Sequence, residues 1–264
     1  MATKESTKST KATDLGANRT GVQTAPMRAK EMLENTQAVA ADPEGAAAAI
    51  ATARAELSQR APPVGTMPVP GNLKGAAKTA MKALKGEKAT VFLDKLGERL
   101  AFERTGVRLY DAVLAKMPAS RTSEGTLSAE DMRHFRDEEL AHMHLVKEAI
   151  EKLGGDPTAV TPCADLKGVE GMGLVQVVTD PRTTLTQCLD TILTAELADN
   201  DGWKILIAMA EALGQDELAR RFADALAEED RHLQAVRSWI AERLEIQLGK
   251  AMPSADFGEP ARPA

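Results

Sequence analysis

Four histidines occur in this 264-residue chain, and two of them follow a glutamate by three positions. These pairs read E-L-A-H at residues 139–142 and E-D-R-H at residues 229–232. Residues three apart lie on one face of a helix, so each glutamate and its histidine could bind the same ion. Imidazole nitrogen combined with carboxylate oxygen suits iron or manganese, and also zinc. The two pairs therefore predict a metal site, provided that helices bring them together.

The surrounding sequence predicts four long helices, at about 87–117, 128–153, 181–213 and 216–248. On each of them apolar residues recur every three or four positions, which predicts one buried face per helix. Near its middle, every such face carries a carboxylate: in chain order Glu103, Glu139, Glu196 and Glu229. The faces of the second and fourth helices add His142 and His232. All six side chains are therefore expected to point into one core.

Burial of four glutamates creates a charge problem. A buried carboxylate without a partner costs several kcal/mol, whereas the net stability of a domain is only about 5–15 kcal/mol. No Lys or Arg lies on the predicted central faces, so we expect no internal counter-charge there. Two divalent cations would balance the four charges, which predicts a dinuclear site. Glu138 and Glu228 adjoin the ligands but lie off these faces, and we expect them to be solvated.

The connections between the helices favour one topology. The first and last pairs are joined by links of about ten residues or fewer, which makes antiparallel hairpins. Residues 154–180 form a long Pro- and Gly-containing segment, which we interpret as a connector that runs the length of the bundle. Asp180 is expected to cap the third helix, with Pro181 at its first position. Two hairpins with a long crossover form an all-α, ferritin-like four-helix bundle.

This bundle is predicted to occupy residues 73–249. Residues 1–72 are predicted to form a disordered to weakly helical extension: an arm at 1–27, one or two Ala-rich helices within 28–60, and a Pro-rich linker. Residues 250–264 are expected to be a loose tail.

Composition excludes several classes of protein. The net charge of −6 argues against nucleic acid as a partner. No apolar run of about 18 residues is available to span a membrane. Two cysteines without a CxxC motif argue against a disulfide framework, a zinc ribbon or an iron–sulfur site. We therefore expect a cytoplasmic protein.

The ligand pattern resembles the ferritin-like di-iron carboxylate superfamily, whose site takes one Glu from each of two helices and Glu-x-x-His from each of the other two. Within it, the rubrerythrin group is the most similar over about residues 87–248. Tyr110 lies seven residues after Glu103, as in rubrerythrin-like first helices, where the phenol can contact a metal-bound carboxylate. Asp199, three residues after Glu196, stands where rubrerythrins place an additional carboxylate, usually Glu. The rubredoxin module of full-length rubrerythrins, with its paired CxxC motifs, is missing.

This resemblance implies a non-haem di-iron oxidoreductase of the peroxidase or ferroxidase type, which reacts with hydrogen peroxide or dioxygen and protects against peroxide or free Fe(II). Two iron ions would be its cofactor, with manganese possible, and Tyr110 and Asp199 would act beside them. A peroxidase without the rubredoxin module would need an external electron-donor protein. A homodimer is expected by analogy.

Several alternatives stay open. They are a dimanganese catalase, an iron-storage protein that forms a shell or lies inside one, and an oxygenase with an organic substrate. A metal-free structural bundle is a further alternative, against which the buried charges weigh.

Overall fold

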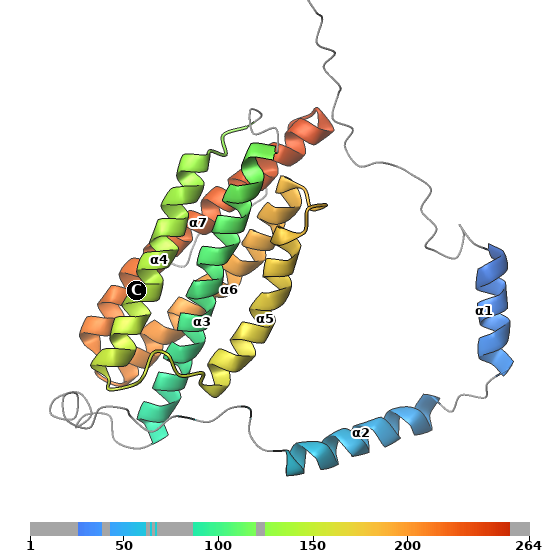
Figure 1. Ribbon diagram of the computed structural model, residues 1–264, viewed down its shortest axis with the longest axis horizontal. Coiled ribbons are helices and arrows are strands. Elements are labelled where there is room, and N and C mark those ends of the chain that lie inside the picture. The colour runs from blue at the N-terminus through green and yellow to red at the C-terminus, as the bar shows by residue number, and fades with distance from the viewer. Residues whose placement is uncertain are drawn as a thin grey trace, which may run out of the picture. The chain divides into compact units, whose positions relative to one another are not determined.

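The computed structural model describes residues 26–38, 43–61, 64, 67, 87–119 and 125–253. These residues include helices and no strands (Figure 1). The chain divides into two units, residues 1–62 and 63–264. The predicted disordered arm, most of the Pro-rich linker and the end of the tail lie outside the described residues. No helix in the described ranges combines the length and the apolar character that crossing a membrane requires.

The first unit contains two helices, α1 (Pro26–Ala38) and α2 (Pro43–Arg60). Ala29 is the buried residue of α1. On α2 the larger apolar side chains, Ile50 and Leu57, are more than half exposed. Alanine-rich helices of this kind bury little apolar surface and gain little stability from packing. The division of the chain at residues 72 and 73 stays a prediction.

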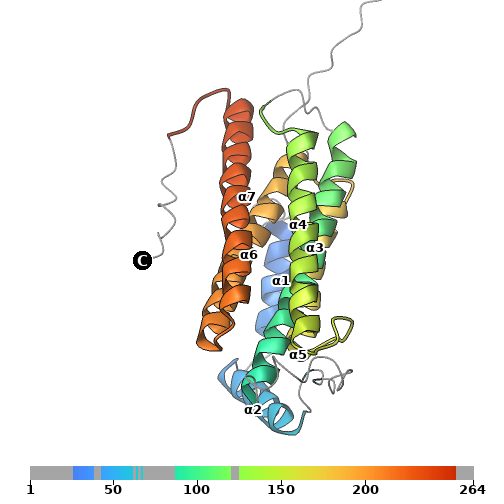
Figure 2. The same cartoon turned by 90° about the vertical axis from the view of Figure 1, so that its left-hand side faces the viewer.

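In the part of the second unit that the structure describes there are five α-helices. They are α3 (Glu87–Lys116), which continues into a 3₁₀ turn at Met117–Ala119, then α4 (Ala129–Lys152), α5 (Pro162–Thr179), α6 (Leu185–Ala212) and α7 (Asp216–Leu248). α3 packs along α4, and α6 packs along α7, so the two hairpins form as predicted (Figure 2). The four-helix bundle predicted from the sequence is confirmed.

The crossover between the hairpins contains a helix, α5, which was not predicted from the sequence. α5 packs along α3, on the side away from α4 (Figure 1). Thr161 caps it by accepting a hydrogen bond from the backbone N–H of Ala164. Gly171 faces α3 closely, because a Cβ there would lie 3.0 Å from Cγ2 of Thr105. α5 is apolar on most of its circumference, so its sequence lacks the periodic alternation of apolar and polar residues that predicts a half-buried helix.

The start of α6 also differs from its prediction. Thr184, rather than Asp180, caps this helix: its side chain accepts from the backbone N–H of Gln187, while the Gln187 side chain accepts from that of Thr184. This reciprocal capping box satisfies two N–H groups of the first turn. Asp180 instead ends α5 and holds the side chain of Arg182. The predicted end of α7 is confirmed, because Gly249 adopts the left-handed conformation there, with φ 62°.

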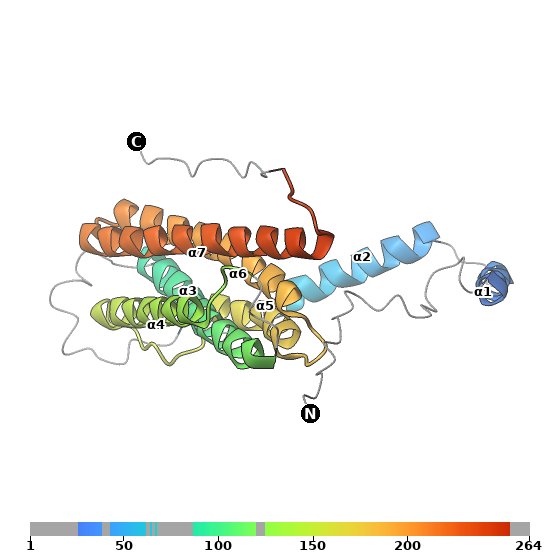
Figure 3. The same ribbon diagram turned by 90° about the horizontal axis from the view of Figure 1, so that it is seen from above.

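Two apolar clusters fill the bundle, with a polar layer between them. One includes Tyr110, Phe135, Ile192 and Trp239, and the other includes Phe92, Val146, Trp203 and Phe222. Along α4 and α6 the buried residues pass from the first cluster through carboxylates to the second. Seen from above, α4 and α7 run side by side, so their middle turns face each other at the level of this layer (Figure 3).

Candidate metal centre

The six predicted ligands meet in the polar layer. Glu103 comes from α3, Glu139 and His142 from α4, Glu196 from α6, and Glu229 and His232 from α7. None of these side chains is more than 2% exposed. Apolar residues lie three or four positions from each of them on the same helix face. Packing of these apolar residues in the core also places the charged groups inside. The structure thus brings all six together, while their role as metal ligands stays a prediction.

Within the described residues, the possible ligand atoms form three overlapping groups, and two of these groups contain a histidine. The first, which we call the Glu196 half, contains Glu196 and His232 with Glu139 and Glu229; the second, the Glu103 half, contains Glu103 and His142 with Glu229. Within each group the ligand atoms lie within 4.8 Å of one another. Glu229 serves both halves, because its Oε1 is 2.7 Å from Nδ1 of His142 and its Oε2 is 3.2 Å from Nδ1 of His232. A shared carboxylate is the arrangement that a pair of bridged ions requires.

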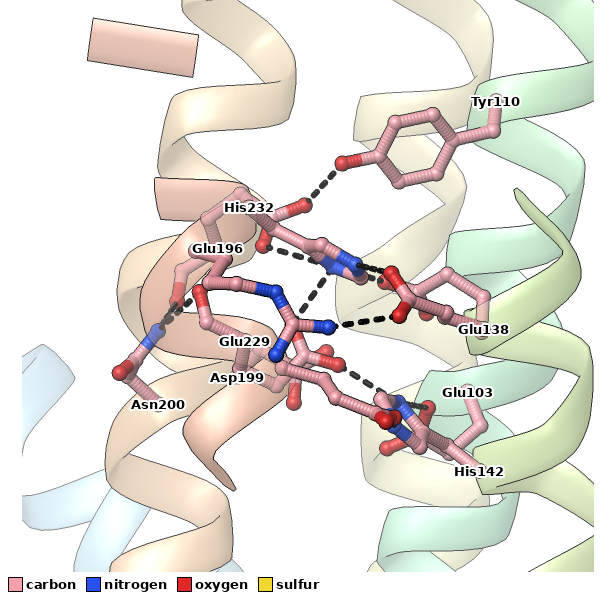
Figure 4. A network of polar contacts seen from close by, with 12 residues as sticks. Glu103, Tyr110, Glu138, His142, Glu196, Asp199, Asn200, Glu229 and His232 are labelled. Carbon is pink, nitrogen blue, oxygen red and sulfur yellow. Dashed lines mark hydrogen bonds and ion pairs between the residues drawn. The ribbon is translucent and has the colours of Figure 1, made fainter. Parts of the chain in front are cut away.

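Two carboxylates hold the histidines from outside, which contradicts the expectation that they are solvated. Nε2 of His142 is 2.8 Å from Oε2 of Glu228, and Nε2 of His232 is 2.8 Å from Oε2 of Glu138 (Figure 4). When Nε2 donates to a carboxylate, Nδ1 faces the centre as an acceptor, as a metal ligand must. The prediction was wrong because each glutamate faces the neighbouring helix instead of water. The repeated E-E-x-x-H at 138–142 and 228–232 was the available signal.

A buried arginine contradicts the expectation of no internal counter-charge. Arg99 is 4% exposed, and its Nε lies 2.7 Å from Oε1 of Glu103. Its Nη2 lies 3.0 Å from Oδ1 of Asp199, and Nη1 donates to the backbone oxygen of the same residue at 3.1 Å. The reason is that α3 packs against α6 as well as α4, so Arg99 reaches Asp199 and the ring of Trp203 on α6 from outside the predicted face. Arg99 precedes Glu103 by four residues on the same helix, and this spacing could have predicted their contact.

The two residues singled out beside the ions lie in different halves. Tyr110 donates a hydrogen bond from Oη to Oε1 of Glu196 at 2.6 Å (Figure 4). Asp199 is bound to Arg99, although its carboxylate also lies close to Glu103, Glu139 and Glu229. Neither contact could be assigned from the sequence, since both join residues about ninety to a hundred positions apart.

Two further residues shape the centre. Asn200 donates from Nδ2 to the backbone oxygens of Glu196, at 3.2 Å, and Glu229, at 3.3 Å, and so ties α6 to α7 at this level. Gly106 on α3 leaves room for Glu139, because a Cβ there would lie 2.0 Å from Oε2 of that side chain. Sequence reasoning missed both, and a single glycine or asparagine in a helix carries no clear signal of such a role.

Burial controls protonation of the metal-free centre. Removal from water raises the pKa of Glu103, Glu196 and Asp199 well above the ordinary values of carboxyl groups. Burial also acts to raise the pKa of Glu229, but the two histidines outweigh it and hold that pKa below its usual value. Burial opposes protonation of His232, yet its carboxylate neighbours raise its pKa. The metal-free centre therefore retains extra protons, which bound cations would displace.

The residues present fit a pair of divalent ions. Buried ligand atoms without a hydrogen-bond partner include Nδ1 of both histidines, Oε2 of Glu103, both carboxylate oxygens of Glu229, and one oxygen each of Glu139 and Glu196. Such atoms are costly unless something binds them. The five ionised carboxylates, Asp199 included, and one guanidinium leave four negative charges, which is the charge that two divalent cations neutralise. Asp199 and Arg99 cancel one another, so the charge balance expected from four glutamates still holds.

Comparison with known proteins locates the family relationship in this part of the chain. The family model of the ferritin-like domain matches residues 126–244, which span α4 to most of α7 and five of the six predicted ligands. Glu103 on α3 lies before the matched range. No curated protein and no solved structure shows significant similarity to the chain. Residues 126–244 thus form a ferritin-like domain, which α3 completes as a four-helix bundle with a buried carboxylate and histidine cluster that fits a di-metal site.

Proposed function

We propose that this protein is a non-haem di-iron oxidoreductase that reacts with hydrogen peroxide or dioxygen, in the manner of a rubrerythrin-like peroxidase or a ferroxidase. The observation that carries the proposal is Glu229, which faces both histidines and so joins two complete ligand groups. Two Fe(II) ions bound there would supply the two electrons that either oxidant accepts.

Burial of the centre favours a small substrate. The ligand side chains are at most 2% exposed, and the rings of Phe135 and Trp203 pack against His232 and His142, with centroids 4.2 and 5.5 Å apart. Peroxide and dioxygen are small enough to reach such a centre, whereas an organic substrate would need a wider path. The packing also excludes bulk water and strengthens the charge interactions inside.

Tyr110 would orient one ligand during the reaction. Burial, followed by the nearby charge of Glu196, raises the pKa of the phenol well above its ordinary value, so it stays protonated at neutral pH. Its hydrogen bond therefore holds Oε1 of Glu196 and leaves Oε2 facing His232 at 3.8 Å. A protonated phenol at this position could also give a proton to a substrate oxygen nearby.

The remaining features carry over from the resemblance as parts of the proposal. The chain has no CxxC motif, so a peroxidase reaction would draw electrons from a separate donor protein. A cytoplasmic location and a homodimer remain proposals of the same kind.

Metal content tests the proposal first. The protein would be loaded anaerobically with Fe(II), desalted and analysed for metal per chain, alongside His142→Ala and His144→Ala. His144 is an exposed residue on the same helix and serves as the matched control. About two irons in the wild type and in His144→Ala, with a clear loss in His142→Ala, would support the site. Absence of stoichiometric metal, or equal binding by all three proteins, would contradict it.

Turnover assays would then separate the candidate activities. Peroxide loss that depends on an added reductant supports a peroxidase, and oxygen consumption with Fe(II) supports a ferroxidase. Oxygen release from peroxide without reductant, with manganese bound, would identify a dimanganese catalase instead. Far more than two irons per chain in a very large particle would identify a storage protein.

A further inference from the structure

The two halves of the centre correspond position by position. Glu103 corresponds to Glu196, and Glu138, Glu139 and His142 correspond to Glu228, Glu229 and His232. Each terminal glutamate has one oxygen held and one oxygen facing a histidine Nδ1. The free oxygen of Glu103 is 3.9 Å from His142, and that of Glu196 is 3.8 Å from His232. The ligand geometry of the two halves is therefore closely matched.

The groups that hold these glutamates differ in charge. Oε1 of Glu196 accepts a hydrogen bond from the neutral phenol of Tyr110 at 2.6 Å. Oε1 of Glu103 lies 2.7 Å from the guanidinium of Arg99. Within the described residues, Arg99 is the only lysine or arginine that is buried. One half therefore has a guanidinium against its terminal ligand, with Asp199 bound to the same guanidinium, and the other half has an uncharged phenol.

Arg99 is held in place from several sides. Besides Glu103, it contacts the side chain and the backbone oxygen of Asp199. Its guanidinium carbon lies 4.4 Å from the centroid of the Phe102 ring. Gly202 gives it room, because a Cβ at that residue would come within 2.2 Å of Nη1. A cation anchored in this way cannot move aside easily when a metal ion arrives.

We propose that Arg99 makes the two metal positions unequal, so that the Glu196 half binds its ion first and more tightly, and the Glu103 half binds second. The inference rests on the proposed di-metal centre. Asp199 offsets part of the charge of Arg99, but the guanidinium lies against Glu103 and competes with a divalent ion for the charge of that carboxylate. Tyr110 is uncharged and holds one oxygen of Glu196 only by a hydrogen bond. In a medium less polar than water, one charge a few ångströms from an ion changes its affinity by about tenfold or more.

Charges near the other half do not offset this difference. Arg231 lies 2.7 Å from Glu138, which holds His232, but its side chain is 56% exposed. Water and salt screen a charge at the surface far more than a buried one. Arg231 also acts on this half only through Glu138 and His232, whereas Arg99 contacts the terminal glutamate Glu103 directly.

Stepwise binding of Co(II) to the full-length protein tests this order, followed anaerobically by calorimetry and by the visible spectrum of the bound ion. Wild type should bind two ions in steps separated by about tenfold or more in affinity. His142→Ala disrupts the Glu103 half and should retain the tight step. His232→Ala disrupts the Glu196 half and should lose the tight step while retaining a weak one.

Charge variants then identify Arg99 as the cause. Arg99→Met alone would leave Glu103 and Asp199 buried without a partner, so the main variant is the balanced pair Arg99→Met with Asp199→Asn. It should bring the two steps together, mainly by strengthening the second. Arg99→Lys keeps the charge and should keep them apart. A substitution that only perturbs the fold would instead weaken both metal-binding steps.

The outcomes separate the two levels of inference. Fewer than two ions at saturation in wild type would contradict the di-metal centre itself. Two equal steps in wild type, a tight step that survives in His232→Ala but not in His142→Ala, or unequal steps that persist in the balanced variant would overturn the role of Arg99 alone.

Discussion

The two halves of the centre have the same ligands and different surroundings. In the Glu196 half, Tyr110 holds the terminal glutamate and the ring of Phe135 lies 4.2 Å from that of His232. In the Glu103 half, Arg99 holds the terminal glutamate and links it to Asp199. The ligand types repeat because the same spacing repeats on two pairs of helices. The properties of each half therefore depend on residues that do not repeat.

The largest effect is expected where the halves are joined. Glu229→Gln removes the charge that faces both histidines, so both ions should be lost rather than one. Metal analysis after loading and desalting would show this. Glu148→Gln is the control, since Glu148 is an exposed carboxylate of α4 whose partner is Arg221. Retention of one ion by Glu229→Gln would mean that the halves do not depend on a common carboxylate.

A change at Gly106 should also affect both halves. In Gly106→Ala the new methyl group would lie 2.0 Å from Oε2 of Glu139, so this carboxylate must move out of the centre. We expect metal affinity to fall more than about a hundredfold, because a ligand and not only its support is displaced. Calorimetric titration would measure the loss.

Gly168→Ala on α5 is the matched control. A Cβ at Gly168 meets nothing within 4 Å. It should leave metal binding unchanged and stabilise the helix by about 0.5–1 kcal/mol. Equal metal affinity in the two alanine variants would show that Glu139 is not required in its present position.

The outer carboxylates allow each half to be weakened separately. Glu138→Gln should lower the affinity of the Glu196 half, and Glu228→Gln that of the Glu103 half, by roughly tenfold to a hundredfold. The effect of Glu138 should be larger, because its side chain is 13% exposed and that of Glu228 is 37% exposed. Each variant serves as the control for the other in a stepwise titration. The same loss in both steps would contradict the assignment of one histidine to each half.

A smaller effect is expected at Tyr110. Tyr110→Phe keeps the ring beside Phe135 but removes the hydrogen bond to Glu196. We expect the affinity of the Glu196 half to fall by about tenfold, since a hydrogen bond to a charged group contributes about 1.5 kcal/mol at the low end of its range. The second step should not change. A larger loss in the Glu103 half would show that the tyrosine acts through the fold and not through its neighbour.

The stability of the metal-free protein should depend on pH differently from that of the metal-loaded protein. Glu103, Glu196 and both histidines have raised pKa values in the metal-free fold, so these groups bind more protons in the folded state than in the unfolded state. Stability from these groups is therefore present at low pH and is lost as pH rises from about 5 to 8. Thermal unfolding of the metal-free protein should show a decline of a few degrees over this range.

The metal-loaded protein should behave in the opposite way. Metal ions bind deprotonated ligands, so their stabilising effect increases as pH rises. The gap in Tm between loaded and metal-free protein should therefore widen from pH 5 to 8. A constant gap would mean that the carboxyl and imidazole groups do not exchange protons for metal.

How much of the fold could be predicted from the sequence differs from one helix to the next. Most of the buried faces of α4 and α7 could be predicted, because both helices are strongly amphipathic, although Ile150, Ala219 and Leu233 are buried outside the predicted faces. The buried face of α3 was predicted too narrowly, since α5 covers a second side of it and Arg99 reaches Asp199 on α6. α5 itself was missed because it is apolar on most sides, and periodicity is the signal that separates helix from connector.

The sequence by itself determined which carboxylates and histidines face the core and the four helices that carry them. Spacing of three or four residues places a side chain on a helix face, and this is a local property of one segment. The tertiary structure decided which partner each side chain has. The reciprocal contacts of Glu138 and Glu228, the choice of Tyr110 for Glu196 and the placement of Arg99 against Asp199 all depend on what a neighbouring helix offers at the same height. That alignment follows from how whole helices pack, and no spacing within a single helix encodes it.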